Sequence, residues 1–261
     1  MSARTSLELL STSRATDGAW MAAADVASAA EAAGVEYRLV GGNAVTLLTH
    51  VHGVAGRVPE RETADADMGA SMQVCGSPGL LAALPAQAYA QLDGSRFERK
   101  TAGRVLTIDL LAPSYSGTML SNQAAGPVVV DAVPGLGLAL ARPATVVAVA
   151  VVLSHGERIA FSVHLPDLLS ALVLKSSAYR GRFADRDALD VWRLLEAAHS
   201  AGIRSEEWPG GTEGRDGALS LRTHFGDASS AGPKKATREK ASQARIRALV
   251  NTLVPDPRRR R

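Results

Sequence analysis

The sequence predicts a mixed α/β protein, more closely an α+β arrangement, in which a small mixed β-sheet flanked by helices is followed by a mainly helical C-terminal lobe. Two observations predict this class. Strand-like apolar segments occur before residue 165, for example at residues 104–111. From Pro166 onward the apolar residues recur with helical spacing. We therefore expect a core at residues 1–164, a helical lobe at 165–231, and a basic C-terminal helix and tail at 232–261.

The composition is that of a folded globular protein. Hydrophobic residues make up 46% of the 261 residues and charged residues 21%, which argues against wholesale disorder. Aromatic residues make up only 4%, so we expect a core of Ala, Val and Leu. No uninterrupted apolar run reaches membrane-spanning length, and the N-terminal residues lack the apolar region of a signal peptide. We expect a cytoplasmic protein with no membrane partner.

The net charge of +3 is distributed unevenly along the chain. Residues 232–261 contain ten Lys or Arg and two Asp or Glu, a surplus of +8, which leaves −5 for the rest of the chain. A basic terminal segment commonly binds nucleic acid or another polyanion, and it can equally be an ordinary solvated terminus. Both interpretations remain open from the sequence.

The first predicted element is an Ala-rich helix over residues 20–33, with Asp17 as its N-cap and Gly34 as its stop. A short strand over residues 35–40 follows it. Residues 51–60 contain two glycines and a proline, and they are predicted to form a loop.

A Gly-Gly turn joins the first strand to a predicted helix over residues 43–50. Glycines at Gly41 and Gly42 would let backbone N–H groups approach a ligand closely. The N-terminus of the helix would add partial positive charge, which favours an anion such as a triphosphate. This turn is therefore a candidate phosphate-binding element.

Two carboxylates two residues apart, Asp65 and Asp67, lie in the next predicted strand. Side chains on a strand alternate between faces, so both carboxylates would project from the same side. Hard cations such as Mg²⁺ bind one or two carboxylates and complete their shell with water and substrate phosphates. A third carboxylate, Asp109, lies between Ile108 and Leu110, where an unpaired charge would be costly.

The later elements follow from proline positions, period-two alternation and helical spacing. A predicted hairpin places Asp109 beside the strand of Asp65 and Asp67. The elements in order are a helix at 78–90, hairpin strands at 96–100 and 104–111, a loop at 113–127, strands at 128–133, 148–153 and 158–163, helices at 166–180 and 187–200, a mobile loop at 209–232, and a basic helix with the apolar stripe Ile246, Leu249, Val250 and Leu253 that ends at Pro255.

Several residues invite other chemistry, which the pattern does not favour. His50 and His52 are two residues apart and do not share a helix face, so a metal pair is not expected. Cys75, the single cysteine, excludes an internal disulfide and is expected to be a small buried side chain. Ser154 and Ser170 lie in no glycine elbow, so nucleophilic catalysis is not expected.

The order of a glycine pair, an Asp-x-Asp strand and a later strand with one carboxylate resembles the DNA polymerase β-like nucleotidyltransferase superfamily. The stretch from Lys175 to Trp192 adds a second likeness. Its Lys-x-x-Ala-x-x-x-Arg segment, followed by Arg-Asp-x-x-Asp, is similar to the pattern of the AbiEii-type toxin nucleotidyltransferases, the group that includes the MenT toxins. Together these blocks cover roughly residues 35 to 200.

The resemblance implies a role for each matched residue. Asp65, Asp67 and Asp109 would bind Mg²⁺ or Mn²⁺, and Lys175, a compact charge on an apolar helix, would contact the nucleoside triphosphate (NTP). Asp187 and Asp190 lie one turn apart on the next helix and would orient Lys175 or assist proton transfer, while Asp185 is interpreted as an N-cap. The residues expected to hold the triphosphate or steer its phosphates are Gly41, Gly42, Asn43, Arg61, Thr63, Lys175 and Asp187.

The function implied is transfer of a nucleoside monophosphate (NMP) from an NTP to an acceptor hydroxyl, with pyrophosphate as the leaving group. The resemblance further implies a toxin of a toxin–antitoxin system that acts on the 3′ end of tRNA and is neutralised by a partner antitoxin. One alternative is an antibiotic-modifying nucleotidyltransferase, which shares the sheet motifs. Another is a non-catalytic nucleotide-binding or nucleic-acid-binding module of the same fold.

Overall fold

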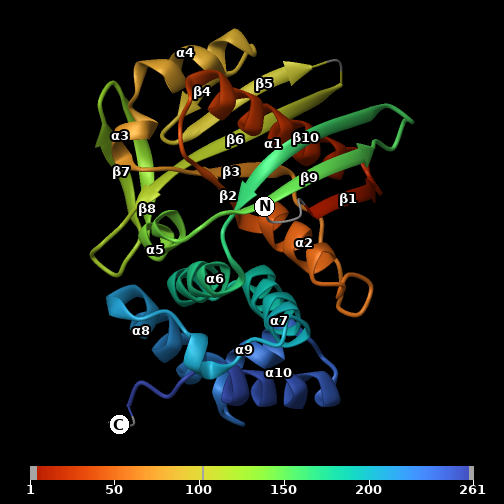
Figure 1. Ribbon diagram of the computed structural model, residues 1–261, viewed down its shortest axis with the longest axis vertical. Helices are drawn as coiled ribbons and strands as arrows, with labels where there is room; N and C mark the ends of the chain where they lie inside the picture. The colour runs from red at the N-terminus through yellow and green to blue at the C-terminus, as the bar shows by residue number, and fades with distance from the viewer. Residues whose placement is uncertain (1–4, 102, 259–261) are drawn as a thin grey trace.

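The computed structural model describes residues 5–101 and 103–258, and it confirms the mixed α/β class. Two β-sheets with their covering helices form the upper part of the molecule in Figure 1, and a layer of helices forms the lower part. The strand-to-helix change falls where the sequence predicts it, because the last strand ends at Leu165 and the next helix begins at Leu168. No helix among the described residues combines the length and apolar character needed to cross a membrane.

The first helix, α1 (Arg14–Ala33), begins earlier than predicted, and the prediction of Asp17 as its N-cap is wrong. Ser13 caps the helix by accepting a hydrogen bond from the N–H of Thr16 at 3.2 Å. Asp17 is fully buried in the first turn, where it accepts hydrogen bonds from the N–H and the hydroxyl of Ser154 at 2.8 and 2.6 Å. Gly34 ends the helix with a φ of 62°, as predicted.

The larger sheet carries the Asp-x-Asp strand between an edge strand and its longest strand. Strand β3 (Asp65–Gly69) pairs antiparallel with β2 (Arg38–Val40) and parallel with β6 (Arg104–Pro113). The long strand β6 pairs on its other edge first with β5 (Arg96–Thr101) and then with β8 (Val128–Val133). Strands β4 (Ala90–Asp93) and β7 (Leu120–Ala125) complete the sheet at β5 and β8. The predicted loop at 113–127 is therefore partly wrong, because β7 lies within it.

A second, smaller sheet has the order β1-β9-β10, so the core contains two sheets rather than the single predicted one. Strands β9 (Thr145–Val152) and β10 (Arg158–Leu165) correspond to the strands predicted at 148–153 and 158–163, and they pair antiparallel as a hairpin. Strand β1 (Thr5–Leu10) pairs parallel with β9, and it is not among the predicted strands. Helix α1 packs against β6 of the larger sheet and β10 of the smaller one, so it joins the two sheets (Figure 1).

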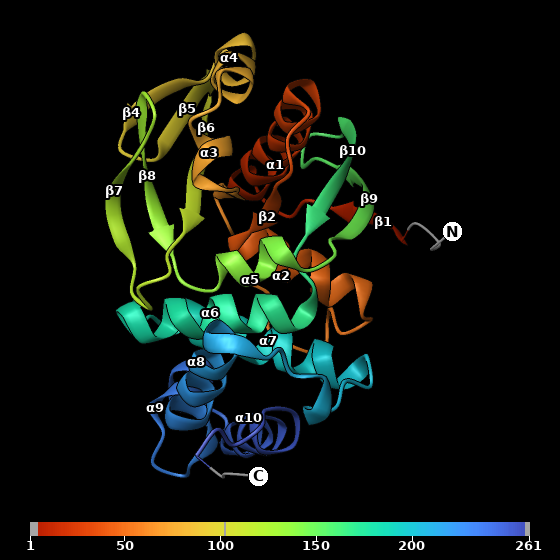
Figure 2. The same ribbon diagram turned by 60° about the vertical axis from the view of Figure 1, so that its left-hand side comes forward.

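The helices that complete the core lie at the ends and faces of these sheets (Figures 1 and 2). Helix α2 starts at the Gly-Gly turn, as predicted. The predicted helix at 78–90 ends at Ala86, because residues 87–89 form a turn that leads into β4. The bounds are α2 (Gly41–Val51), α3 (Met72–Cys75), α4 (Pro78–Ala86) and α5 (Leu136–Ala141).

Helices α6 (Leu168–Arg182) and α7 (Asp185–Ser200) form the layer directly beneath the sheets, as Figure 2 shows. Below them lie a 3₁₀ turn at Ser205–Glu207, α8 (Gly211–Leu221), a π-helical turn at Arg222–Gly226, and α9 (Ala231–Ala236). The predicted loop at 209–232 is therefore wrong. Gly217 within it serves close packing, since a side-chain carbon there would stand 2.7 Å from the Cγ2 atom of Val173 on α6.

The C-terminal helix α10 (Lys240–Leu253) confirms the predicted apolar stripe. All four stripe residues are buried against the helical lobe, and α10 packs against α7 and α9. Most of the basic segment is thus docked on the lobe rather than extended from it. Arg259, Arg260 and Arg261 lie outside the described residues.

Candidate functional site

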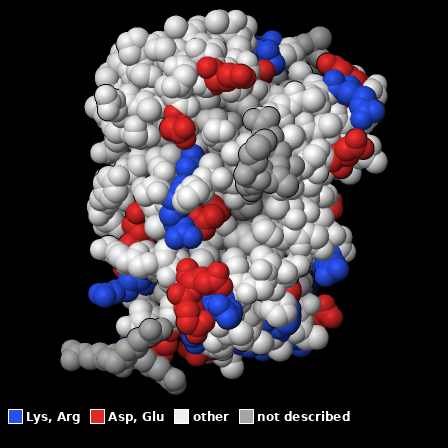
Figure 3. Space-filling view, in the orientation of Figure 1, with Lys and Arg blue, Asp and Glu red and all other residues white. Residues whose placement is uncertain are grey.

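A cavity of about 590 Å³ lies between the larger sheet and helix α6. Its sheet side carries the carboxylates of Asp67, Asp109 and Asp131, and its helix side carries Lys175 and Arg182. Figure 3 shows acidic and basic side chains together at mid-height of one face, where the sheets meet the helical lobe. The cavity therefore has an acidic wall facing a basic one.

Two of the predicted metal ligands lie directly beside each other. Asp67 on β3 is the register partner of Asp109 on β6, which confirms the predicted placement of Asp109 next to the Asp-x-Asp strand. Asp65 lies two residues before Asp67 on the same strand, but it does not line the cavity. Burial, followed by the negative charge of Asp65, raises the pKa of Asp67 to about 7, and Asp109 adds to this effect. A cation at Asp67 would relieve this repulsion.

Arg96 on β5 holds the carboxylate of Asp109. Its Nε and Nη2 atoms donate to the two carboxylate oxygens at 3.1 and 3.0 Å. Within residues 5–101 and 103–258, no three His, Cys, Asp or Glu side chains are grouped closely enough to hold a metal ion. The donor chemistry nevertheless fits a hard divalent cation, because the carboxylates of Asp67 and Asp109 share one face of two adjacent strands.

The glycine turn is shaped by the carboxylate beside it. Gly41 has a φ of 69°, and a side-chain carbon on it would stand 1.6 Å from Oδ2 of Asp67. A side chain on Gly42 would stand 2.2 Å from Oγ1 of Thr63. Gly41 itself lines the cavity, so the start of α2 reaches the site as the sequence predicts. Both glycines are required by close approach, and Gly41 also by its backbone conformation.

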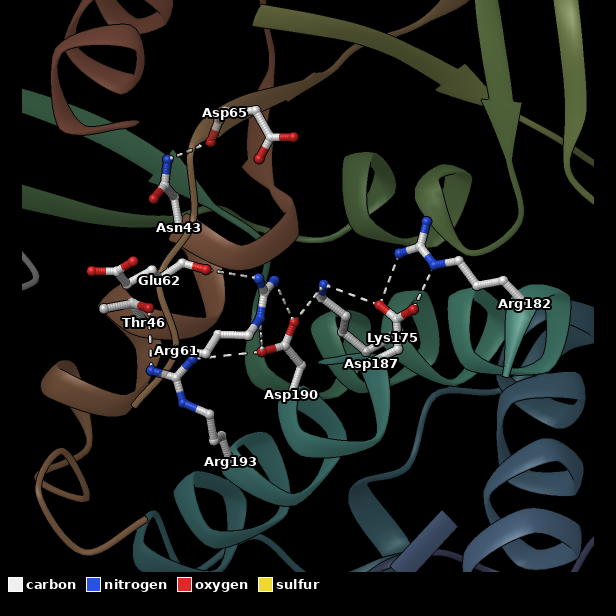
Figure 4. Close-up of polar contacts among 10 residues, drawn as sticks. All are labelled: Asn43, Thr46, Arg61, Glu62, Asp65, Lys175, Arg182, Asp187, Asp190 and Arg193. Carbon is white, nitrogen blue, oxygen red and sulfur yellow. Dashed lines mark hydrogen bonds and ion pairs between the residues drawn. The ribbon is translucent and has the colours of Figure 1, made fainter. Parts of the chain in front are cut away.

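A chain of ion pairs runs behind the basic wall, from Arg61 through Asp190, Lys175 and Asp187 to Arg182 (Figure 4). Nζ of Lys175 lies 2.7 Å from Oδ2 of Asp190 and 3.6 Å from Oδ1 of Asp187. Nε and Nη2 of Arg61 donate to both oxygens of Asp190 at 3.0 Å. Both carboxylates are fully buried, and Lys175 is only 7% exposed. Asp187 and Asp190 thus orient Lys175, as expected.

This chain of ion pairs carries an excess of positive charge. Burial opposes ionisation of Asp190, but the positive charges of Lys175 and Arg61 and the hydrogen bonds from both outweigh it and lower the pKa of Asp190. Arg193 is also buried and approaches Asp190 at 3.5 Å. Four cations therefore surround two buried carboxylates, and the excess positive charge suits an anionic ligand.

The remaining predicted phosphate contacts lie outside the cavity lining. The side-chain amide of Asn43 donates to the backbone carbonyls of Ala19 at 3.3 Å and Asp65 at 3.1 Å, so it fixes the start of α2. Thr63 is buried beside Gly42, and its hydroxyl has no hydrogen-bond partner among the described residues. These side chains shape the glycine turn from behind.

Cys75 and Asp185 do not line the cavity. Cys75 is buried as expected, and burial raises the pKa of its thiol to about 11. The interpretation of Asp185 as an N-cap is wrong, because Ala184 occupies that position and Asp185 pairs with Lys235 at 2.8 Å.

Sequence reasoning did not single out Arg96, Arg180 or Asp131. The hairpin register pairs Arg96 with Asp109, and alternation along β8 places Asp131 on the cavity face. Both signals were present in the predicted strands. Arg180 required knowledge of how α6 is turned against the sheet.

No family model matches the chain, and a search of curated proteins finds no match either.

Proposed function

We propose that the protein is a metal-dependent nucleotidyltransferase that transfers an NMP group from an NTP to an acceptor hydroxyl, with pyrophosphate leaving. The observation that carries this proposal is the pairing of two walls across one cavity. The acidic wall contains Asp67 and Asp109, and the basic wall contains Lys175 and Arg182. A triphosphate accompanied by a divalent cation presents the complementary charges to both walls.

Asp67 and Asp109, assisted by Asp65, would hold Mg²⁺ or Mn²⁺. The ion would supply charge neutralisation on the phosphates and a lowered pKa of the attacking hydroxyl. Lys175 would donate to phosphate oxygens as a point charge held by Asp187 and Asp190, which limits its motion before the substrate arrives.

The start of α2 would contribute backbone N–H groups at Gly41 and Gly42. Asn43 and Thr63 would act indirectly, since their side chains support this turn. Arg61 would act indirectly as well, by holding Asp190, whose Oδ2 also pairs with Lys175.

The acceptor proposed is the 3′-terminal hydroxyl of tRNA, with the protein as the toxin of a toxin–antitoxin pair and a cognate antitoxin as its partner. The sequence resemblance and the basic C-terminal segment support this proposal. Lys235 of that segment pairs with Asp185, which follows Arg182 at the cavity by three residues. An RNA strand whose end enters the cavity would therefore meet the basic segment close by.

The test is incubation of the protein with each α-labelled NTP, Mg²⁺, and total RNA, total protein or a panel of aminoglycosides. Label in the 3′ end of tRNA supports the proposal. Label in an aminoglycoside alone would replace tRNA with an antibiotic acceptor, and NTP binding without transfer to any acceptor would indicate a non-catalytic module. Asp67→Asn serves as the inactive variant and Asp93→Asn, at an exposed position on β4, as its matched control.

A further inference from the structure

We propose that a side compartment of the cavity binds the base of the NTP and selects bases that carry an exocyclic amino group. This proposal rests on the proposed nucleotidyltransferase function. The compartment has a volume of about 180 Å³ and shares Gly117, Pro134, Ser177 and Arg180 with the main cavity. It is smaller than the pockets that enclose a whole drug-sized ligand, and it suits one ring system attached to a larger molecule.

The polar groups of the compartment include both an acceptor and a donor. Asp216 on α8 lines it, and among the described residues no hydrogen bond or ion pair engages the Asp216 carboxylate. One nitrogen of the Arg180 guanidinium donates to the carbonyl of Gly117, and its other N–H groups have no hydrogen-bond partner within residues 5–101 and 103–258, so a ligand can accept from them. Oδ2 of Asp216 lies 3.8 Å from the position that a side-chain carbon on Gly117 would occupy, so the carboxylate faces that loop.

Glu213 differs from Asp216 because it has a structural partner. Its Oε1 accepts a hydrogen bond from the N–H of Gly135 at 2.8 Å, which ties α8 to the start of α5. Asp216 is therefore the carboxylate that a ligand can engage. Tyr115 and Pro134 supply ring surfaces to the same compartment, against which a planar base can lie.

The charge distribution orients the nucleotide. In the compartment the carboxylates of Asp216 and Glu213 outnumber Arg180, the one cation among the described residues that line it, and repel phosphate groups. At the main cavity Lys175 and Arg182 attract phosphates, and the proposed divalent cation would neutralise the carboxylates of the acidic wall. The triphosphate is thus directed to the basic wall and the base to the side compartment.

The chemistry of the two groups defines the base. A carboxylate accepts hydrogen bonds from an amino group such as N4 of cytosine or N2 of guanine, and a guanidinium donates to a base carbonyl or ring nitrogen. Uracil has a carbonyl where cytosine has its amino group, and that oxygen would face the carboxylate of Asp216. ATP, CTP and GTP therefore bind more tightly than UTP, and GTP more tightly than ITP, which lacks only the amino group.

The experiment measures the dissociation constants of CTP, UTP, GTP, ITP and inorganic tripolyphosphate for the full chain in Mg²⁺, without acceptor, by titration calorimetry. We expect CTP to bind at least about tenfold more tightly than UTP, and Asp216→Asn to reduce or invert that ratio while leaving tripolyphosphate binding unchanged. Asp216→Ser is the second variant in case the amide disturbs folding, which a thermal melt would reveal. Asp185→Asn, a first-turn carboxylate of α7 outside the compartment, is the control that should retain the wild-type ratio.

Equal affinities for CTP and UTP in the wild-type protein overturn the base pocket, as does an unchanged ratio in both Asp216 variants. If tripolyphosphate still binds in either case, the triphosphate site stands and only the base pocket falls. If neither NTPs nor tripolyphosphate bind, the proposed function is overturned together with this inference.

Discussion

Replacing Asp67 with Asn should stabilise the protein, although Asp67 is at the centre of the proposed active site. The reason is that burial and the charge of Asp65 raise the pKa of Asp67 from 3.8 to about 7. The ionised carboxylate therefore destabilises the folded state at neutral pH. The amide in Asp67→Asn keeps the shape of the side chain beside Gly41 and removes the charge.

The size of the expected stabilisation follows from the difference in the pKa of Asp67 between the folded and unfolded states. The difference between 3.8 and about 7 corresponds to roughly 4 kcal/mol at about 1.4 kcal/mol for each pH decade. Because a folded-state pKa raised above the unfolded value means that the folded state binds more protons, the cost in the wild type is absent below pH 3.8, grows as the pH rises, and is complete above 7. The amide retains some desolvation cost, so we expect a net gain of about 1–3 kcal/mol at pH 8 and less at pH 5.

The assay is urea unfolding of wild type and variant at pH 5, 6 and 8. Asp93→Asn, on the exposed strand β4, is the matched control and should change stability at none of these values. Mg²⁺ should stabilise the wild type at pH 8 and have little effect on Asp67→Asn. A variant less stable than wild type at pH 8, or a gain that does not depend on pH, would refute the reasoning.

Asp190→Asn should destabilise the protein, because the pKa of Asp190 is lowered by Lys175 and Arg61. We expect the free energy of unfolding in urea to fall by about 3–5 kcal/mol at pH 7 and by less at acid pH, where the wild-type carboxylate becomes protonated; an unchanged midpoint would contradict this. Lys175→Ala should weaken NTP binding in calorimetry, whereas Lys234→Ala, at an exposed position, should not. Equal effects of the two variants would indicate that the helical lobe does not contact the triphosphate. Arg96→Gln should tighten Mn²⁺ binding measured by electron paramagnetic resonance, because the guanidinium competes for the Asp109 carboxylate; weaker binding would instead make it a positioning residue. Charge reversal of residues 258–261 should weaken RNA binding and flatten its salt dependence without changing the nucleotide added, and a changed product would contradict a purely electrostatic role.

Local patterns were sufficient to predict the central strands and helices of the core. Period-two alternation and the predicted hairpin placed Asp109 beside the Asp-x-Asp strand, whereas the position of Lys175 at the site came from the family resemblance. Hydrophobic burial enforces the alternation, because a shift by one residue would turn the carboxylates into the core.

The elements and contacts that were not predicted have physical causes that are not visible in local sequence patterns. Strand β1 pairs with β9, which lies about 140 residues further along the chain, so its place in a sheet depends on a distant partner rather than on a local turn signal. The segment of α8 resembles a loop because Gly214 and Gly217 are poor helix formers, yet close packing against α6 requires a small residue at Gly217. The ion pair of Arg61 with Asp190 depends on a tertiary contact between distant elements, whereas that of Arg96 with Asp109 follows from the register of the predicted hairpin.

The most direct test of the central claim follows both ends of the triphosphate. Wild-type protein is incubated with Mg²⁺, tRNA and an NTP labelled at either the α- or the γ-phosphate. We predict that the α-label enters the acceptor, that the γ-label leaves in pyrophosphate, and that Asp67→Asn lowers the rate by at least about a hundredfold while remaining folded. Release of γ-label as inorganic phosphate, or transfer by Asp67→Asn at the wild-type rate, would contradict the assignment of this cavity as a nucleotidyltransferase site.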